Sequence, residues 1–152
     1  MKTRTIGLRL TIFFALAALC LADPQIGTWK LNEAKSKLNP TAVKTITAIY
    51  SLVGDNVSVV LEAVDKDGRT IHSVWTGKFD GKEYPVIGDP SQDARSYRVV
   101  DANTVEVSFI KDAKVTRLNL ATVSADGKTR TVTPGGESPG KAPEWYAVYD
   151  KQ

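Results

Sequence analysis

Hydrophobic and polar side chains alternate along most of the chain from residue 44 onward. The stretch 44–53 is typical, because apolar side chains take every second position and hydroxyl groups take most of the positions between them. Its apolar face holds Ile46, Ala48, Tyr50 and Leu52. A period of two puts successive side chains on opposite faces of an extended backbone. The pattern therefore predicts a β-strand that is buried on one face.

The same unit, an extended run followed by a tight polar turn, recurs to the end of the chain. Turn residues, often Asp-Gly or Gly-Asp, return about every eight to fourteen residues, and no apolar stripe at helical spacing is long enough to cover a sheet. The expected strands are 27–32, 44–53, 57–63, 69–79, 83–87, 97–99, 105–109, 115–123, 129–133 and 144–149.

Short hairpins between consecutive strands produce an antiparallel meander, and a meander of this size removes its free edges most simply by closing on itself. We therefore expect an all-β fold, an antiparallel up-and-down β-barrel of about 8–10 strands, with the last strand beside the first. A two-sheet sandwich is the structural alternative, but its crossovers usually need longer connections.

The expected first strand places Gly27, Trp29 and Leu31 on one face, so that Trp29 becomes its large buried anchor. We expect Gly27 to leave room for the indole across the base of the barrel. The last strand should then bring Trp145 or Tyr146 near Trp29. After the first strand, one short helical turn is expected at 33–37, capped by the residue before it and ended by a proline.

The first 22 residues have the composition of a signal peptide. Three basic residues precede an apolar run at 10–19, and small residues at 20 and 22 predict cleavage before Asp23, which leaves one domain at 23–152. The run is short for a bilayer of about 30 Å, and Leu19 is a poor fit to a lipid-modified Cys20. We therefore expect an exported protein, periplasmic or secreted, with no stable membrane insertion after cleavage.

Cleavage changes the charge of the chain. The full sequence has 20 Lys+Arg and 17 Asp+Glu, so removing Lys2, Arg4 and Arg9 leaves 17 of each. A neutral domain gives no reason to expect a nucleic-acid partner. The single cysteine also lies in the signal peptide, so the domain is expected to contain no disulfide.

The chain offers little for catalysis or metal binding. His72 is the only histidine, and its neighbours in sequence form no nucleophile motif, so we expect no enzyme and no cofactor. The stretch 65–68 begins like a calcium loop, but Thr76 stands where the loop needs a bidentate glutamate. A hairpin turn is the better interpretation, and we expect no metal site.

The interior of the barrel offers the better candidates for a function. Residues that we expect to line the lumen are Tyr50, His72, Trp75, Tyr97, Phe109 and Tyr146, with Arg98 or Arg117 as further polar side chains. Alternation alone leaves two alternatives open. The aromatic rings either fill the barrel completely or surround a cavity for a ligand.

The opening Gly-x-Trp strand, with the segments 27–36, 79–86 and 101–107, resembles the lipocalin and calycin superfamily. More narrowly, these segments are similar to uncharacterised exported bacterial proteins that are called lipocalin-like. The resemblance implies an up-and-down barrel of eight or ten strands that holds a small apolar molecule. A non-catalytic envelope or interaction module with a filled barrel is the alternative function.

The chain departs from that superfamily in its tail. Residues 145–151 contain no arginine to pack on Trp29 and no Arg-x-Tyr pair of the kind with which fatty-acid-binding relatives hold a carboxylate. Arg95 and Tyr97 have that spacing, but on an earlier strand. The Thr-Asp-Tyr type of motif is also missing. The ligand is therefore expected to be neutral or weakly polar.

Overall fold

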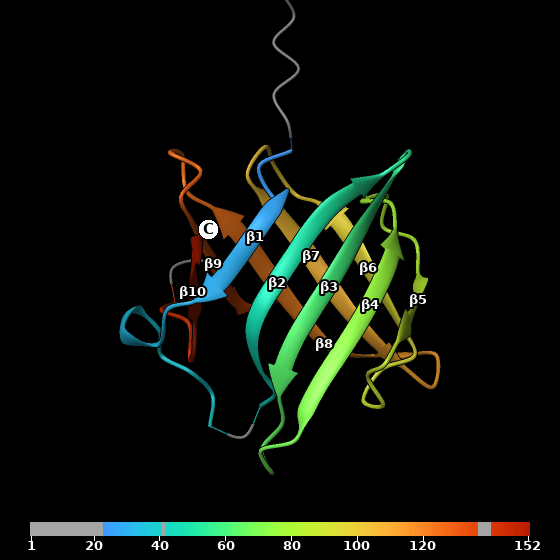
Figure 1. The fold of residues 1–152 in the computed structure, drawn as a ribbon, viewed down its shortest axis with the longest axis horizontal. Coiled ribbons are helices and arrows are strands. Elements are labelled where there is room, and N and C mark those ends of the chain that lie inside the picture. Colours follow the sequence, from blue (N-terminus) through green and yellow to red (C-terminus); the bar gives the residue numbers. More distant parts are fainter. Residues whose placement is uncertain (1–22, 41, 137–140) are drawn as a thin grey trace, which may run out of the picture.

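The computed structural model describes residues 23–40, 42–136 and 141–152, so the predicted signal peptide at 1–22 lies outside the described residues. In the described part, ten strands form one closed antiparallel barrel (Figure 1). They are β1 (Gly27–Leu31), β2 (Lys44–Val53), β3 (Asn56–Val64), β4 (Thr70–Gly77), β5 (Tyr84–Ile87), β6 (Ala94–Val99), β7 (Thr104–Lys111), β8 (Lys114–Val123), β9 (Thr129–Pro134) and β10 (Ala147–Lys151).

Each strand pairs with its neighbours in sequence, and β1 pairs with both β2 and β10 to close the barrel. The predicted all-β up-and-down barrel is therefore confirmed. The expected helical turn is also present, as the 3-10 helix η1 (Glu33–Lys35), in which the Asn32 side chain accepts a hydrogen bond from the Lys35 amide at 3.2 Å. No helix among the described residues is long and apolar enough to cross a membrane.

Up-and-down connectivity sends alternate connections to opposite ends of the barrel. The hairpins β2–β3, β4–β5, β6–β7 and β8–β9 lie at one end, with residues 23–26 beside them, and we call this the closed end. The connections β1–β2, β3–β4, β5–β6, β7–β8 and β9–β10 lie at the other end, which we call the open end. Figure 1 shows the two sets of connections on opposite sides of the tilted strands.

Trp29 anchors the closed end. Its side chain is fully buried, and its indole N–H donates to the Gln25 carbonyl oxygen at 2.8 Å. The ammonium group of Lys151 lies 5.1 Å from the ring centroid, so a lysine on β10 supplies a cation beside the first-strand tryptophan.

Two expectations about this region are wrong. The register of β1 and β10 places Trp29 opposite Lys151, whereas Tyr146 pairs with Lys37, so Trp145 and Tyr146 lie away from Trp29. Gly27 does not make room for the indole. It has a φ of 141°, and a Cβ built on it would lie 2.5 Å from Cε of Lys151, so its missing side chain makes room for the lysine.

Aromatic rings fill the barrel above Trp29. Trp75 is 1% exposed, its ring centroid lies 4.5 Å from that of Tyr97, and its indole N–H donates to the Arg95 carbonyl oxygen at 2.9 Å. Phe79 stacks on Tyr97, and Tyr84 meets Trp75 edge to face. This packing leaves the closed end filled, so any space for a ligand has to lie toward the open end.

Candidate functional site

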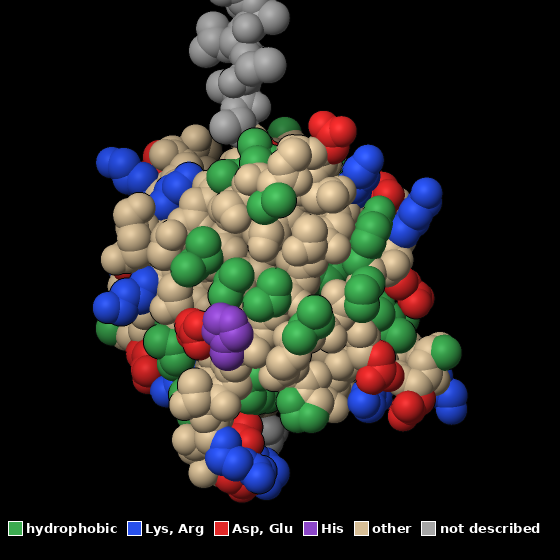
Figure 2. Space-filling view, turned by 45° about the vertical axis from the view of Figure 1, so that its right-hand side comes forward, with side chains coloured by type: hydrophobic (Ala, Val, Ile, Leu, Met, Phe, Trp, Pro, Cys, Tyr) green, Lys and Arg blue, Asp and Glu red, His purple; other side chains and the backbone are tan. Residues whose placement is uncertain are grey.

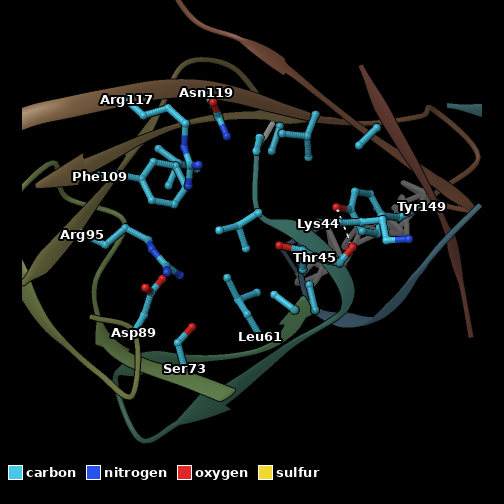
Figure 3. Close-up of a pocket in the computed structure, with 18 of the residues that line it drawn as sticks. Lys44, Thr45, Leu61, Ser73, Asp89, Arg95, Phe109, Arg117, Asn119 and Tyr149 are labelled. Atoms are coloured by element: carbon cyan, nitrogen blue, oxygen red, sulfur yellow. Dashed lines mark hydrogen bonds between the residues drawn. The ribbon is translucent and has the colours of Figure 1, made fainter. Parts of the chain in front are cut away.

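The open half of the barrel contains a cavity of about 160 Å³. Its walls combine aliphatic and aromatic side chains of the strands with residues of the β1–β2 and β5–β6 connections, and Figure 3 shows labelled side chains arranged around it. Apolar lining residues include Leu61, Ala63, Ile71, Val107, Phe109 and Val132. The hydrophobic inward face that alternation predicted is therefore divided between a packed closed end and this cavity.

A hydrogen-bonded network forms the floor between the cavity and the closed end. Its members, in order, are Gln25, Arg130, Tyr50, Tyr97, Arg95 and Gln92. Arg130 donates through Nε to the Gln25 side-chain oxygen at 3.0 Å and through Nη2 to the Tyr50 hydroxyl at 2.6 Å. The two tyrosine hydroxyls lie 3.5 Å apart, and Arg95 donates to that of Tyr97 at 3.3 Å.

Burial affects the pKa of two tyrosines that line the cavity. It raises the pKa of Tyr50, although the positive charge of Arg130 acts in the opposite direction. Burial also raises the pKa of Tyr149, whose hydroxyl donates to the Thr45 carbonyl oxygen at 3.2 Å. These hydroxyls therefore act as neutral hydrogen-bonding groups at ordinary pH.

Two arginines flank one aromatic ring on the cavity wall. Arg95 on β6 lies opposite Phe109 on β7, and Phe109 lies opposite Arg117 on β8, so the three form one row across neighbouring strands. The guanidinium carbon of Arg117 lies 3.7 Å from the Phe109 ring centroid, and that of Arg95 lies 5.1 Å from it. Figure 3 shows all three side chains on one side of the cavity.

Some buried polar atoms of this wall lack partners. Among the described residues these atoms are Nη2 of Arg95, Nε of Arg117 and Oδ1 of Asn119. Arg95 is 1% exposed, so solvent at the surface does not reach its side chain freely. Burial, followed by the like charge of Arg95, lowers the pKa of Arg117.

One carboxylate, Asp89, lines the cavity among the described residues. Burial acts to raise its pKa, but hydrogen bonds from Ser91 and Gln92 outweigh that effect and lower the pKa. The hydroxyl of Ser91 donates at 2.6 Å, and the Gln92 amide donates to the second oxygen. Asp89 is therefore ionised and already holds hydrogen bonds from its own loop.

Comparisons of the chain with protein-family models, with curated proteins and with solved structures found no match. The closed antiparallel barrel is compatible with the calycin-like fold that the sequence resemblance implies.

The structure brings together three of the six predicted lumen residues. Tyr50, Tyr97 and Phe109 line the cavity. Trp75 faces inward but belongs to the packed closed end, and Tyr146 lies on the connection that leads into β10, where it pairs with Lys37.

His72 lies on the outer surface, so its expected lumen position is wrong. Along β4, Ile71 and Ser73 face the cavity, and His72 between them faces outward, where its Nδ1 contacts the Glu62 carboxylate. Figure 2 shows this histidine beside a carboxylate on the surface. Arg98 is also outside, paired with Glu106 at 2.8 Å. Both follow from the period of two, because each stands next to an inward residue.

Arg95 and Arg130 are two of the cavity residues that the sequence interpretation missed. Arg95 shares a face with Tyr97 on β6, and Arg130 shares a face with Val132 on β9, so alternation contained the signal for both. Arginine is rarely buried, which is why these positions were not expected inside. No group of three or more metal-ligating side chains occurs among the described residues.

Proposed function

We propose that this chain is an exported lipocalin-like protein that binds a small, largely apolar molecule in the cavity of its barrel. The cavity in the open half carries the proposal, because a completely filled barrel would leave a ligand no interior volume. The basic and apolar segments of 1–22 support export.

The size of the cavity limits the ligand. A cavity of about 160 Å³ is close to the volume of about 150 Å³ that holds benzene in an engineered protein core. A single aromatic ring or a short aliphatic chain therefore fits. A long lipid would have to leave most of its chain outside the barrel.

The chemistry of the lining groups favours binding over catalysis. Three arginines line the cavity, and arginine holds its proton at physiological pH, so it is a poor general acid or base. Asp89 is held ionised by hydrogen bonds from its own loop. We therefore propose a binding protein and no enzyme.

Two matched tryptophan variants test this proposal. The purified protein is titrated with benzyl alcohol and hexan-1-ol, and its tryptophan emission and unfolding temperature are measured. We expect a change in emission, because Trp145 lines the cavity, and a rise in unfolding temperature with ligand concentration. Val107→Trp, which places an indole in the cavity, should abolish both effects.

Ile87→Trp is the control, because it adds the same indole to a side chain that is 72% exposed. It should leave the response unchanged. The proposal is wrong if none of benzyl alcohol, hexan-1-ol, benzoate and hexanoate alters the emission or stability of the wild-type protein. It is also wrong if the Val107 variant folds and responds as the wild type does.

A further inference from the structure

The cavity holds more positive charge than its own residues neutralise. Three arginines and one carboxylate line it among the described residues, namely Arg95, Arg117, Arg130 and Asp89, while the ammonium group of Lys44 is paired with Glu33 at 3.0 Å. Burying a cation without a counter-charge is costly, so buried arginines are normally paired. Within the described residues no salt bridge joins any of the three arginines to a carboxylate.

The three arginines differ in which of their N–H donors lack a hydrogen-bond acceptor. Arg130 donates through Nε to Gln25 and through Nη2 to Tyr50, and its guanidinium carbon lies 4.6 Å from the Tyr50 ring centroid. It therefore holds the floor together. Arg95 retains an unpartnered Nη2 and Arg117 an unpartnered Nε, and both atoms are buried.

These two free donors belong to one surface. Arg95 and Arg117 stand on either side of Phe109 in the cross-strand row, and both guanidinium carbons lie within 5.1 Å of its ring centroid. Guanidinium groups bind carboxylate oxygens through short charge-assisted hydrogen bonds. The ring and the aliphatic wall beside it offer an apolar surface to the rest of the same ligand.

We propose that the ligand is a small amphipathic carboxylate, and this inference rests on the proposed binding function. The carboxylate receives hydrogen bonds from Arg95 and Arg117, and its ring or short chain packs against Phe109 and Ile71. This departs from the neutral ligand expected from the tail, because the arginines come from β6 and β8 and not from the last strand.

Two observations favour a carboxylate over a phosphate ester. Asp89 is ionised and lines the same cavity, so a single negative charge is better accommodated than a double one. A phosphate group also occupies more of a cavity of about 160 Å³. The planar carboxylate leaves room for an apolar body.

Matched pairs of an acid and an alcohol test directly whether the cavity prefers a negatively charged ligand. Isothermal titration calorimetry at pH 7 and low salt compares benzoate with benzyl alcohol, and hexanoate with hexan-1-ol, with phenyl phosphate as a further probe. Charge-assisted hydrogen bonds predict that each acid binds at least about tenfold more tightly than its alcohol. We expect phenyl phosphate to bind more weakly than benzoate.

Arg117→Met tests whether the preference depends on this wall, because it removes the charge and keeps a long apolar side chain over Phe109. It should lose the preference for benzoate, bind benzyl alcohol as before and unfold at the wild-type temperature or above it. Arg98→Met is the matched control, since this arginine lies on the outer surface. It should retain the full preference.

Each other outcome has a definite meaning. Equal affinity for benzoate and benzyl alcohol overturns the carboxylate assignment and leaves the binding function standing. Tighter binding of phenyl phosphate overturns the carboxylate in favour of a phosphate ester. A preference that survives in a folded Arg117→Met protein shows that Arg117 does not bind the carboxylate, and it overturns the two-arginine site. Failure of every probe to bind overturns both the inference and the proposed function.

Discussion

Two buried side chains, Trp29 and Arg95, differ in how fully their polar atoms are hydrogen-bonded. Trp29 is completely buried and directs its N–H to the backbone at Gln25, so it closes one end by packing and by one hydrogen bond. Arg95 is almost as deeply buried but keeps an unpartnered donor. Packing explains the burial of Trp29, whereas the free donor of Arg95 is the observation on which the proposed ligand rests.

Replacing Trp29 should destabilise the fold, and the loss should grow with the volume of side chain that is removed. Trp29→Ala leaves a large cavity and should lower the free energy of unfolding by about 3–5 kcal/mol. Trp29→Phe keeps a ring and should cost less. Urea unfolding midpoints check both values, with Trp145→Phe at the open end as a control. Wild-type midpoints for both Trp29 variants would show that this anchor has no such role.

Tyr50 should make the fold sensitive to high pH. Burial raises its pKa in the folded state above the ordinary value near 10, so its stabilising effect is complete below pH 10 and is lost as the pH rises further. Above pH 10 the unfolded chain releases a proton that the folded chain keeps. Each such tyrosine lowers the free energy of unfolding by about 1.4 kcal/mol per pH unit.

Tyr50→Phe removes this proton, so its free energy of unfolding should fall less steeply between pH 10 and pH 11.5 than that of the wild type. Urea titrations at several pH values give the two slopes, and groups shared by both proteins cancel in their difference. Identical slopes would mean that Tyr50 releases its proton as easily in the folded state as in the unfolded one.

At the scale of the element, turns and alternation predicted the strands well. The range 44–53 is confirmed as β2, and each predicted strand has a counterpart. The phase of β8 is harder to predict, because strict alternation puts Arg117 on the same face as Val115, which is exposed. The register shifts between Phe109 and Ile110, which pair with Arg117 and Val115, so an irregularity in the ladder turns Arg117 inward.

The end of β4 shows a constraint that alternation cannot reveal. A Cβ on Gly77 would lie 2.5 Å from the Tyr84 ring and 2.8 Å from the Trp75 ring. Gly77→Ala should therefore cost about 1–3 kcal/mol by overpacking. Combined with Tyr84→Ala, its cost should fall, with non-additivity of at least about 0.5 kcal/mol. Chemical denaturation of the four proteins measures it, and strict additivity would exclude the contact.

At the scale of the whole molecule, one barrel combines a packed end and a hollow end. The sequence predicted a closed barrel and several of its inward residues, but it could not decide between a filled and an open lumen. That difference depends on side-chain volumes meeting across the barrel from strands far apart in sequence, as Trp75 and Tyr97 do. The sequence could not predict the row of Arg95, Phe109 and Arg117 for the same reason, because three different strands contribute one residue each.

A crystal structure of the protein soaked with 4-bromobenzoate tests the central claim most directly, because anomalous scattering locates the bromine independently of any fitted ligand. The structure predicts one strong bromine peak inside the open half of the barrel, near Ile71 and Phe109. It also predicts the carboxylate within hydrogen-bond distance of Nη2 of Arg95 and Nε of Arg117. A cavity without bromine, or a peak only on the outer surface, would contradict the account.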